Sequence, residues 1–328
     1  MRRVEDIAAM RPLLRGRSLA RARAETVPLK ALDAIITSMA TFAAAYLAIA
    51  ARWVPGWRPA FLILCAIAMG PVVFRGLAWR YPETRIWDFL ASFWLLPSVI
   101  LGHFTLEPVV TAAHPVLLDP YLAHADLLLF GAHPSYVLGH LAGPWVTEVL
   151  MICYYSYFVG PFALAMLLWF RGTRSQYEEF ALTLALFFAA NFILYALVPA
   201  VGPRYYLAGI FEAPLRGVLL TPYLDGLMRT TYFARDCFPS GHTGVTLTVL
   251  VVAWRYQRKF FWIFLPVGTG LILGTLVGRF HYGIDLICAV PLMITCLALG
   301  RYLHQRGFTA APDMPHPQSL PTRRPLKA

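Results

Sequence analysis

The chain has 328 residues, of which 59% are hydrophobic and only 14% are charged. Because about a quarter of the residues in an ordinary soluble protein are charged, this composition excludes that class. The net charge of +11 could indicate a nucleic-acid partner, but most of the basic residues lie in the two tails and in alternate loops. That placement indicates membrane topology and attraction to anionic lipid, so we expect a membrane protein with no nucleic-acid partner. One exception is the loop Pro199–Ser240, which contains four arginines: Arg204, Arg216, Arg229 and Arg235.

Apolar runs long enough to cross a bilayer predict an all-α polytopic protein with about eight transmembrane helices and no strands. The run Ala60–Phe74 is short and extends to Trp79 only if Arg75 snorkels toward the headgroups. The run Gly241–Trp254 needs its polar start in a headgroup layer or a cavity. Six or seven spans remain if these two fail. The predicted spans are Leu32–Ala51, Ala60–Phe74, Trp87–Val109, Trp145–Phe170, Phe180–Val198, Gly241–Trp254, Phe260–Gly278 and Tyr282–Leu303.

Basic residues before the first span and after the last predict that both termini are cytoplasmic. The loop Thr111–Pro144, which contains no Lys or Arg, then lies outside, as does the loop Pro199–Ser240. The outer side would be the exterior of a bacterium or the lumen of a eukaryotic compartment, and we favour a bacterial inner membrane. We expect a basic cytoplasmic segment over 1–30, transmembrane helices over 31–110, a catalytic region over 111–304 and a disordered cytoplasmic tail over 305–328.

Several polar residues outside the main clusters have plain interpretations. Asp119 and Asp126 are typical of turns, and the five cysteines are expected to be free thiols because only Cys237 lies in a loop. Glu148, an acid inside a span, is by default a functional hypothesis. The outer-loop histidines have spacings that match no metal-ligand pattern, so we predict no metal site and no cofactor. These histidines are His114, His124, His133 and His140.

The topology places three polar clusters at the outer membrane face, although they lie far apart in the sequence. They read VPAVGPRYYL at 198–207, FPSGHTG at 238–244 and GRFHYGID at 278–285. No single motif among them establishes a site. Because all three clusters are expected on the same side of the membrane, a common site is the simplest interpretation.

The second and third clusters contain the residues that we assign to catalysis. In the second, Ser240 and Gly241 begin a helix whose unpaired N–H groups and partial positive charge suit a phosphate, and His242 projects from its first turn. In the third, His281 and Asp285 are four residues apart and share one helix face. A carboxylate behind an imidazole fixes its tautomer and stabilises its charged form, which makes the histidine a competent nucleophile or base.

Together these groups predict phosphoryl transfer through a phosphohistidine. His281 would attack phosphorus, and His242 would protonate the leaving oxygen and then deprotonate the incoming hydroxyl. Arg204, with Arg235 and Arg279 as further candidates, would hold the phosphate oxygens with planar guanidinium groups. No metal is needed, because arginine and backbone donors stabilise the charge on the equatorial oxygens.

These motifs resemble those of the type 2 phosphatidic acid phosphatase superfamily, whose signature combines an Arg-containing first motif, Pro-Ser-Gly-His and a final His-x-x-x-Asp. The branch that the chain resembles most contains the inositol phosphorylceramide synthases. The resemblance covers roughly Leu118 to Leu292 and implies a six-helix catalytic core. It rests on PSGH at 239–242, HYGID at 281–285, HADLLLFGAHP at 124–134, YYSYFVGP at 154–161 and VPAVGPRYY at 198–206.

The chain departs from the phosphatase branch at positions where that branch has cations. Leu197 stands where the branch has Lys, Pro203 precedes Arg204 instead of following it, and Gly274 and Thr275 replace a Ser-Arg pair. Loss of fixed cations should penalise a doubly charged phosphomonoester more than a singly charged phosphodiester. The departures therefore favour transfer of a phosphate-containing head group from a phospholipid or lipid phosphate to a lipid or polyol alcohol.

Two other functions stay open from the residues alone. A lipid phosphatase differs only in using water as the acceptor. A non-catalytic lipid-binding or transport protein could keep the fold, but it would not need His242, His281 and Asp285 together.

Overall fold

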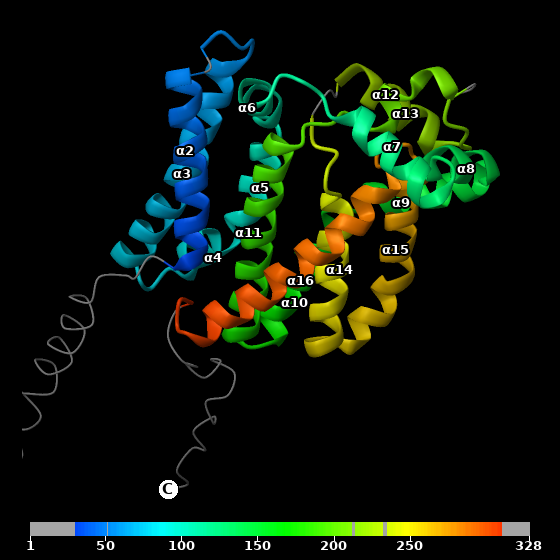
Figure 1. The fold of residues 1–328 in the computed structure, drawn as a ribbon. Helices are drawn as coiled ribbons and strands as arrows, with labels where there is room; N and C mark the ends of the chain where they lie inside the picture. The colour runs from blue at the N-terminus through cyan, green and yellow to red at the C-terminus, as the bar shows by residue number, and fades with distance from the viewer. Residues whose placement is uncertain (1–29, 51, 212–213, 232–234, 310–328) are drawn as a thin grey trace, which may run out of the picture.

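The computed structural model describes residues 30–50, 52–211, 214–231 and 235–309. These residues form helices joined by loops and contain no strand, which confirms the predicted all-α class (Figure 1). The predicted cytoplasmic tail segments over 1–29 and 310–328 lie outside the described residues.

The helices of the described residues follow one another along the chain in the order of their labels. Their bounds are α2 (Ala31–Ala50), α3 (Trp57–Arg80), α4 (Arg85–Phe93), α5 (Leu95–His103), α6 (Leu106–Ala113), α7 (Asp119–Phe130), α8 (Pro134–Leu141), α9 (Pro144–Tyr155), α10 (Val159–Arg171), α11 (Arg174–Leu197), α12 (Pro203–Tyr206), η1 (Ala208–Ile210), α13 (Leu220–Thr231), α14 (Gly241–Tyr256), α15 (Arg258–Val277) and α16 (Gly283–Gln305).

Within the described ranges, five helices (α2, α3, α11, α15 and α16) are long and apolar enough to cross a membrane. Two bent pairs, α4 with α5 at 41° and α9 with α10 at 46°, raise the number to seven if each is one span. The predicted spans over 87–109 and 145–170 are therefore interrupted. Pro97 and Pro161 each lie in the first turn of the second helix, where proline lacks the N–H that would continue the first helix. The number of eight spans stays a prediction.

The hairpin of α2 and α3 contains the main difference from the predicted spans. α3 runs to Arg80, well beyond the predicted end at Phe74. Arg75 does not snorkel as expected: it is buried, and its Nε donates to Asp33 Oδ2 at 2.8 Å while its Nη1 donates to Asp88 Oδ1 at 3.0 Å. An ion pair inside the bundle thus lets the helix continue through Arg75.

We expect Arg75→Leu to destabilise the protein by about 3–5 kcal/mol, because it leaves the fully buried carboxylate of Asp33 without its cation. The measurement is the midpoint of thermal unfolding in detergent micelles. Arg80→Leu, an exposed arginine on the same helix, is the matched control and should change the midpoint little. The double variant Arg75→Leu/Asp33→Leu should recover much of the loss. An unchanged midpoint in Arg75→Leu would contradict this account.

The three polar clusters meet at one end of the bundle. α11 ends at Leu197, α14 begins at Gly241, and α15 and α16 are joined by the short turn after Val277. The segment over 111–144, expected to be an outer loop, contains α7 and α8, and Figure 1 shows both at this same end with α12 and α13. At the opposite end of the bundle, the helix ends contain basic residues: Arg80, Arg85, Arg171, Arg174, Arg255 and Arg258.

Candidate active site

His281 lies in the turn before α16 and is held by Asp285 of the first turn of that helix. The His281 Nδ1 is 3.2 Å from Asp285 Oδ2. The same carboxylate oxygen accepts the Tyr282 N–H at 2.8 Å and the Cys237 thiol at 2.9 Å, and Asp285 is fully buried. With Nδ1–H assigned as the donor to Asp285 from this hydrogen bond, Nε2 keeps its lone pair. That lone pair is what a nucleophile requires.

His242 lies in the first turn of α14 and faces the free side of His281. Its Nδ1 is 3.4 Å from His281 Nε2. Ser240 is the N-cap of α14, and its Oγ accepts the Thr243 N–H at 3.2 Å. The rings of Tyr154 and Tyr157 lie against the His242 imidazole with centroids 4.7 and 4.4 Å away. The cap and the two rings together fix the direction of His242.

A cavity of about 320 Å³ lies over the two imidazoles. His242, His281, Gly241 and Arg204 all line it, whereas Asp285 lies behind His281. The structure therefore brings the predicted nucleophile, the predicted acid and two predicted phosphate ligands, Arg204 and Gly241, to the same space.

Arg204 reaches this cavity with a partner that the sequence did not indicate. Its guanidinium forms an ion pair with Asp225 of α13 and lies 5.1 Å from the centroid of Phe280. The Arg204 backbone N–H donates to Arg279 O at 2.8 Å, which ties the first cluster to the third. The Asp225 carboxylate is thus already paired with the guanidinium that we expect to bind phosphate.

Three further predicted phosphate ligands, Arg235, Arg279 and Ser240, do not line this cavity. Arg235 Nη1 donates to Pro115 O at 2.8 Å, and its Nε is 3.6 Å from a Glu107 carboxylate oxygen. Arg279 lines a separate cavity of about 270 Å³ and stacks over Phe211 at 4.2 Å. Ser240 acts as the helix cap described above. Among the described arginines, only Arg204 lines the cavity over the histidines.

The family model of the PAP2 superfamily matches residues 120–299, more than half of the chain. The chain belongs to the PAP2 superfamily. The matched residues run from α7 into α16 and include His242, His281 and Asp285, so the resemblance to the type 2 superfamily is confirmed. The assignment to the inositol phosphorylceramide synthase-like branch stays a prediction.

One curated relative is a PA-phosphatase related-family protein of Dictyostelium discoideum. It is 19% identical over 199 residues, which are 53% of this chain and 35% of the relative. The chain therefore spans about a third of that relative's length. No solved structure shows a significant match to the chain.

Two aspartates of α7, expected to be turn residues, hold the loops next to Arg204 and His281 in this PAP2 superfamily member. Asp119 accepts the N–H groups of Val201 and Gly202 at 3.0 and 2.9 Å and the Tyr282 hydroxyl at 2.9 Å. These contacts join the segment before Arg204 to the residue after His281. The partners are more than eighty positions away in the sequence, so no local pattern could have indicated them.

Asp126 lies seven residues further along α7, on the same face. It accepts the N–H groups of Gly283 and Ile284, both at 2.9 Å, and so caps the start of α16 from another helix. Burial raises the pKa of the Asp126 carboxyl, and these two N–H groups oppose the shift. The turn that holds His281 is thereby fixed on both sides.

Asp126→Ala is expected to lower kcat/KM about 10- to 100-fold and the free energy of unfolding by about 2 kcal/mol, because two N–H groups at the start of α16 lose their acceptor. Initial rates and thermal unfolding of the purified variant check both. His124→Ala, an exposed residue of the same helix, is the control and should match the wild type. A normal rate in Asp126→Ala would show that the cap does not position His281.

Cys237 is a further hydrogen-bond partner of Asp285, and the sequence did not indicate this contact. Burial, with the carboxylate of Asp285, raises the pKa of the Cys237 thiol well above its ordinary value, so the thiol stays protonated and donates to Asp285. The ligand atoms of Cys237, His281 and Asp285 lie within 4.8 Å of one another, a sulfur, nitrogen and oxygen set that could hold a metal ion. The expectation of a metal-free site stays a prediction.

Glu148 also has a defined role. Its carboxylate accepts N–H groups from Val218 at 2.8 Å and Leu220 at 2.6 Å, and further contacts reach Leu219 and Thr221. These are the N–H groups at the start of α13, where an anion is favoured. Glu148 therefore anchors the helix that carries Asp225.

Proposed function

We propose that this chain is an integral membrane phosphotransferase that moves a phosphate-containing head group between lipid or polyol alcohols through a phosphohistidine. The observation that supports it most is the line of groups from Asp285 through His281 to His242, with 3.2 and 3.4 Å between successive atoms. Asp285 holds one ring nitrogen of His281, and the other nitrogen faces His242 in the cavity. We place this site on the extracytoplasmic face of a bacterial inner membrane, with both termini in the cytoplasm.

The first step forms a bond between His281 Nε2 and phosphorus and breaks the bond from phosphorus to the leaving alcohol. The phosphate enters between the two imidazoles, and His242 gives its proton to the leaving oxygen. Asp285 stabilises the positive charge that develops on His281. Arg204 takes the equatorial oxygens after its ion pair with Asp225 opens.

The second step reverses these roles. His242, now neutral, takes the proton of the acceptor hydroxyl, whose oxygen attacks the phosphohistidine. The bond from phosphorus to His281 breaks, and the imidazole returns to its hydrogen bond with Asp285. Each proton removed from an acceptor replaces one delivered to a leaving group, so no cofactor is consumed.

A lipid phosphatase, with water as the acceptor, is the second candidate. The name of the Dictyostelium relative favours it, because that protein is a PA-phosphatase related-family protein. The cation content of the cavity favours transfer instead: Arg204 is the one described arginine that lines it, and it already faces Asp225. A non-catalytic lipid-binding or transport role is a third candidate. The short distances from Asp285 to His281 and from His281 to His242 disfavour it.

Purified protein in liposomes, supplied with labelled phospholipids and lipid phosphates, distinguishes these functions. A new labelled lipid that forms only when ceramide, diacylglycerol or inositol is added would establish transfer. Free phosphate from monoesters without an acceptor requirement would establish a phosphatase and overturn the transferase proposal. Neither product from a folded protein would overturn both and favour the non-catalytic role.

We expect the activity to persist in excess EDTA, because His281, His242 and Arg204 supply the nucleophile, the acid and the charge without a metal. Initial rates with and without the chelator should agree within about twofold. Loss of activity in EDTA with recovery on adding Zn²⁺ would instead assign the set of Cys237, His281 and Asp285 to a metal.

A further inference from the structure

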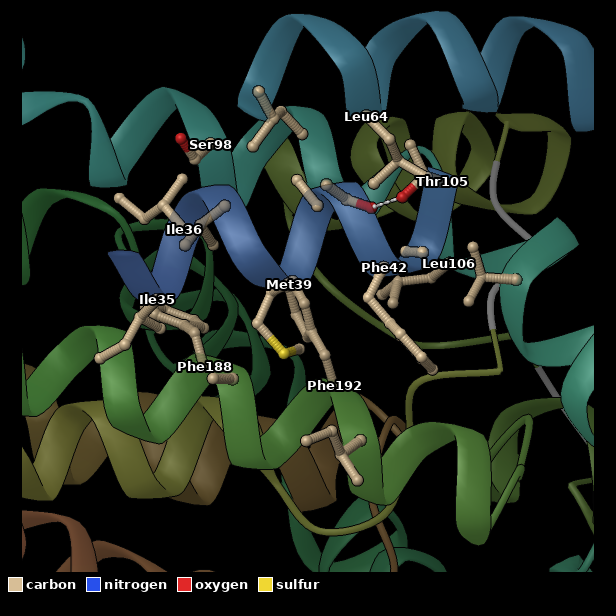
Figure 2. Close-up of a pocket in the computed structure, with 18 of the residues that line it drawn as sticks. Ile35, Ile36, Met39, Phe42, Leu64, Ser98, Thr105, Leu106, Phe188 and Phe192 are labelled. Atoms are coloured by element: carbon tan, nitrogen blue, oxygen red, sulfur yellow. Dashed lines mark hydrogen bonds between the residues drawn. The ribbon is translucent and has the colours of Figure 1, made fainter. Parts of the chain in front are cut away.

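A third cavity, of about 410 Å³, lies between α2, α3, α5, α6 and α11 (Figure 2). We call it the apolar chamber. Among the described residues that line it none is charged, and its two aliphatic hydroxyls are already used. Ser98 Oγ donates to Trp94 O at 2.6 Å, and Thr105 Oγ1 donates to Gly102 O at 2.6 Å. The chamber therefore offers a ligand almost nothing but hydrocarbon contact.

The apolar chamber and the cavity over the histidines share part of their walls. Val99 of α5 and Phe188 and Phe192 of α11 line both spaces. In Figure 2, Phe188 and Phe192 project from α11 toward Ile35 and Met39 of α2, across the chamber. The side chains of Val99, Phe188 and Phe192 therefore form a wall common to the chamber and to the cavity over His281.

The chamber also has a side that faces away from the bundle. Phe42 of α2 and Ile193 of α11 line it and are 74% and 49% exposed. On helices long and apolar enough to span a membrane, such side chains meet lipid tails. A hydrocarbon chain can therefore enter sideways between α2 and α11 without passing through water.

We propose that the apolar chamber holds one hydrocarbon chain of the lipid whose phosphate lies at His281. The inference rests on the proposed function, and it adds where the lipid tail lies and which helices select it. A water-filled chamber would need polar partners that the lining lacks, whereas an acyl chain needs none. The wall shared with the catalytic cavity makes the substrate's own chain the occupant, because head group and tail are covalently joined.

Most of the helices that build the chamber lie outside the region that matches the PAP2 superfamily. α2, α3, α5 and α6 all precede residue 120, where the match to the PAP2 superfamily begins, and only α11 belongs to the matched region. The segment before the family region thus supplies most of the tail site. Chain selectivity would then depend on residues outside the part that performs the chemistry.

Photo-labelling tests the chamber without depending on turnover. The probe is a phosphatidic acid with a diazirine in the middle of one acyl chain, added to the inactive full-length variant His281→Ala in liposomes. We expect the label on peptides of α2 and α11 that line the chamber. In the His281→Ala background, Ala43→Phe, which fills the chamber, should lower this labelling about tenfold. Ala45→Phe, on an exposed face of the same helix, should change it less than twofold.

Label confined to other helices, or equal labelling in the two phenylalanine variants, would overturn the proposal. If Ala43→Phe does not fold, Ala189→Leu fills the same chamber from α11 and replaces it in the test. The positions of the label in the parent His281→Ala protein also test the proposal without any further variant. In active protein, Ala43→Phe should also lower the ratio of rates on a long-chain lipid phosphate and a six-carbon analogue about tenfold. Absence of any turnover would sink the proposed function but leave the labelling result readable.

Discussion

His281→Ala is expected to remove at least about 10³-fold of the rate of head-group transfer or phosphate release, whichever the protein catalyses. The variant lacks Nε2, the atom that would bond to phosphorus, and neither His242 nor Arg204 can replace it. Initial rates on the best substrate measure the loss. A second measurement is the acid-labile, base-stable phosphoenzyme that a phosphohistidine produces after rapid quenching with radiolabelled substrate, and this signal should disappear.

The matched control is His140→Ala, which removes an exposed histidine that does not line the catalytic cavity. It should keep both the rate and the phosphoenzyme. His281→Ala should also keep a near-normal thermal midpoint, because Asp285 retains the Tyr282 N–H and the Cys237 thiol as donors. A folded His281→Ala protein with wild-type activity would end the phosphohistidine mechanism.

His242→Ala should lower the rate about 10²- to 10⁴-fold on lipid substrates, whose alcohol leaving groups need a proton. In the first step, measured as the burst of leaving alcohol in a single turnover, the loss should shrink to about tenfold on an activated aryl phosphate, because its leaving group departs without protonation. The second step still lacks its base, so the phosphoenzyme should accumulate in this variant. Rates across a series of leaving groups, together with the amount of phosphoenzyme, test both expectations.

Tyr157→Phe is the companion variant, since it keeps the ring that packs against His242 and removes only the hydroxyl. It should retain the wild-type dependence on the leaving group. Equal losses for His242→Ala on activated and unactivated substrates would assign that histidine to binding or packing and leave the acid unidentified.

The contact between His281 and Asp285, and the place of His242 beside them, could be predicted from the sequence because the information is local. His281 and Asp285 are one helical turn apart, and the Pro-Ser-Gly start of α14 fixes where His242 points. Topology then placed the two clusters at one end of the bundle. The two bent spans could also have been anticipated, because Pro97 and Pro161 are visible in the sequence.

The supports of the site could not be predicted in the same way. Asp119 and Asp126 bond to backbone N–H groups about 80 and 160 positions away, and hydrophobic periodicity says nothing about such partners. Arg75 was expected at the headgroups, because its partner Asp33 lies on another helix and the sequence does not show that the two side chains meet. Arg235 and Arg279 share the correct end of the bundle with Arg204, but a side chain's direction depends on packing that composition does not specify.

The ion pair between Arg204 and Asp225 has a consequence for how the site handles anions. A phosphate that arrives must compete with a tethered carboxylate, so its apparent dissociation constant rises as the fraction of uncovered Arg204 falls. When the product leaves, the same carboxylate returns to the guanidinium. In the proposed mechanism, this built-in competitor weakens the binding of inorganic phosphate and of released head groups to Arg204.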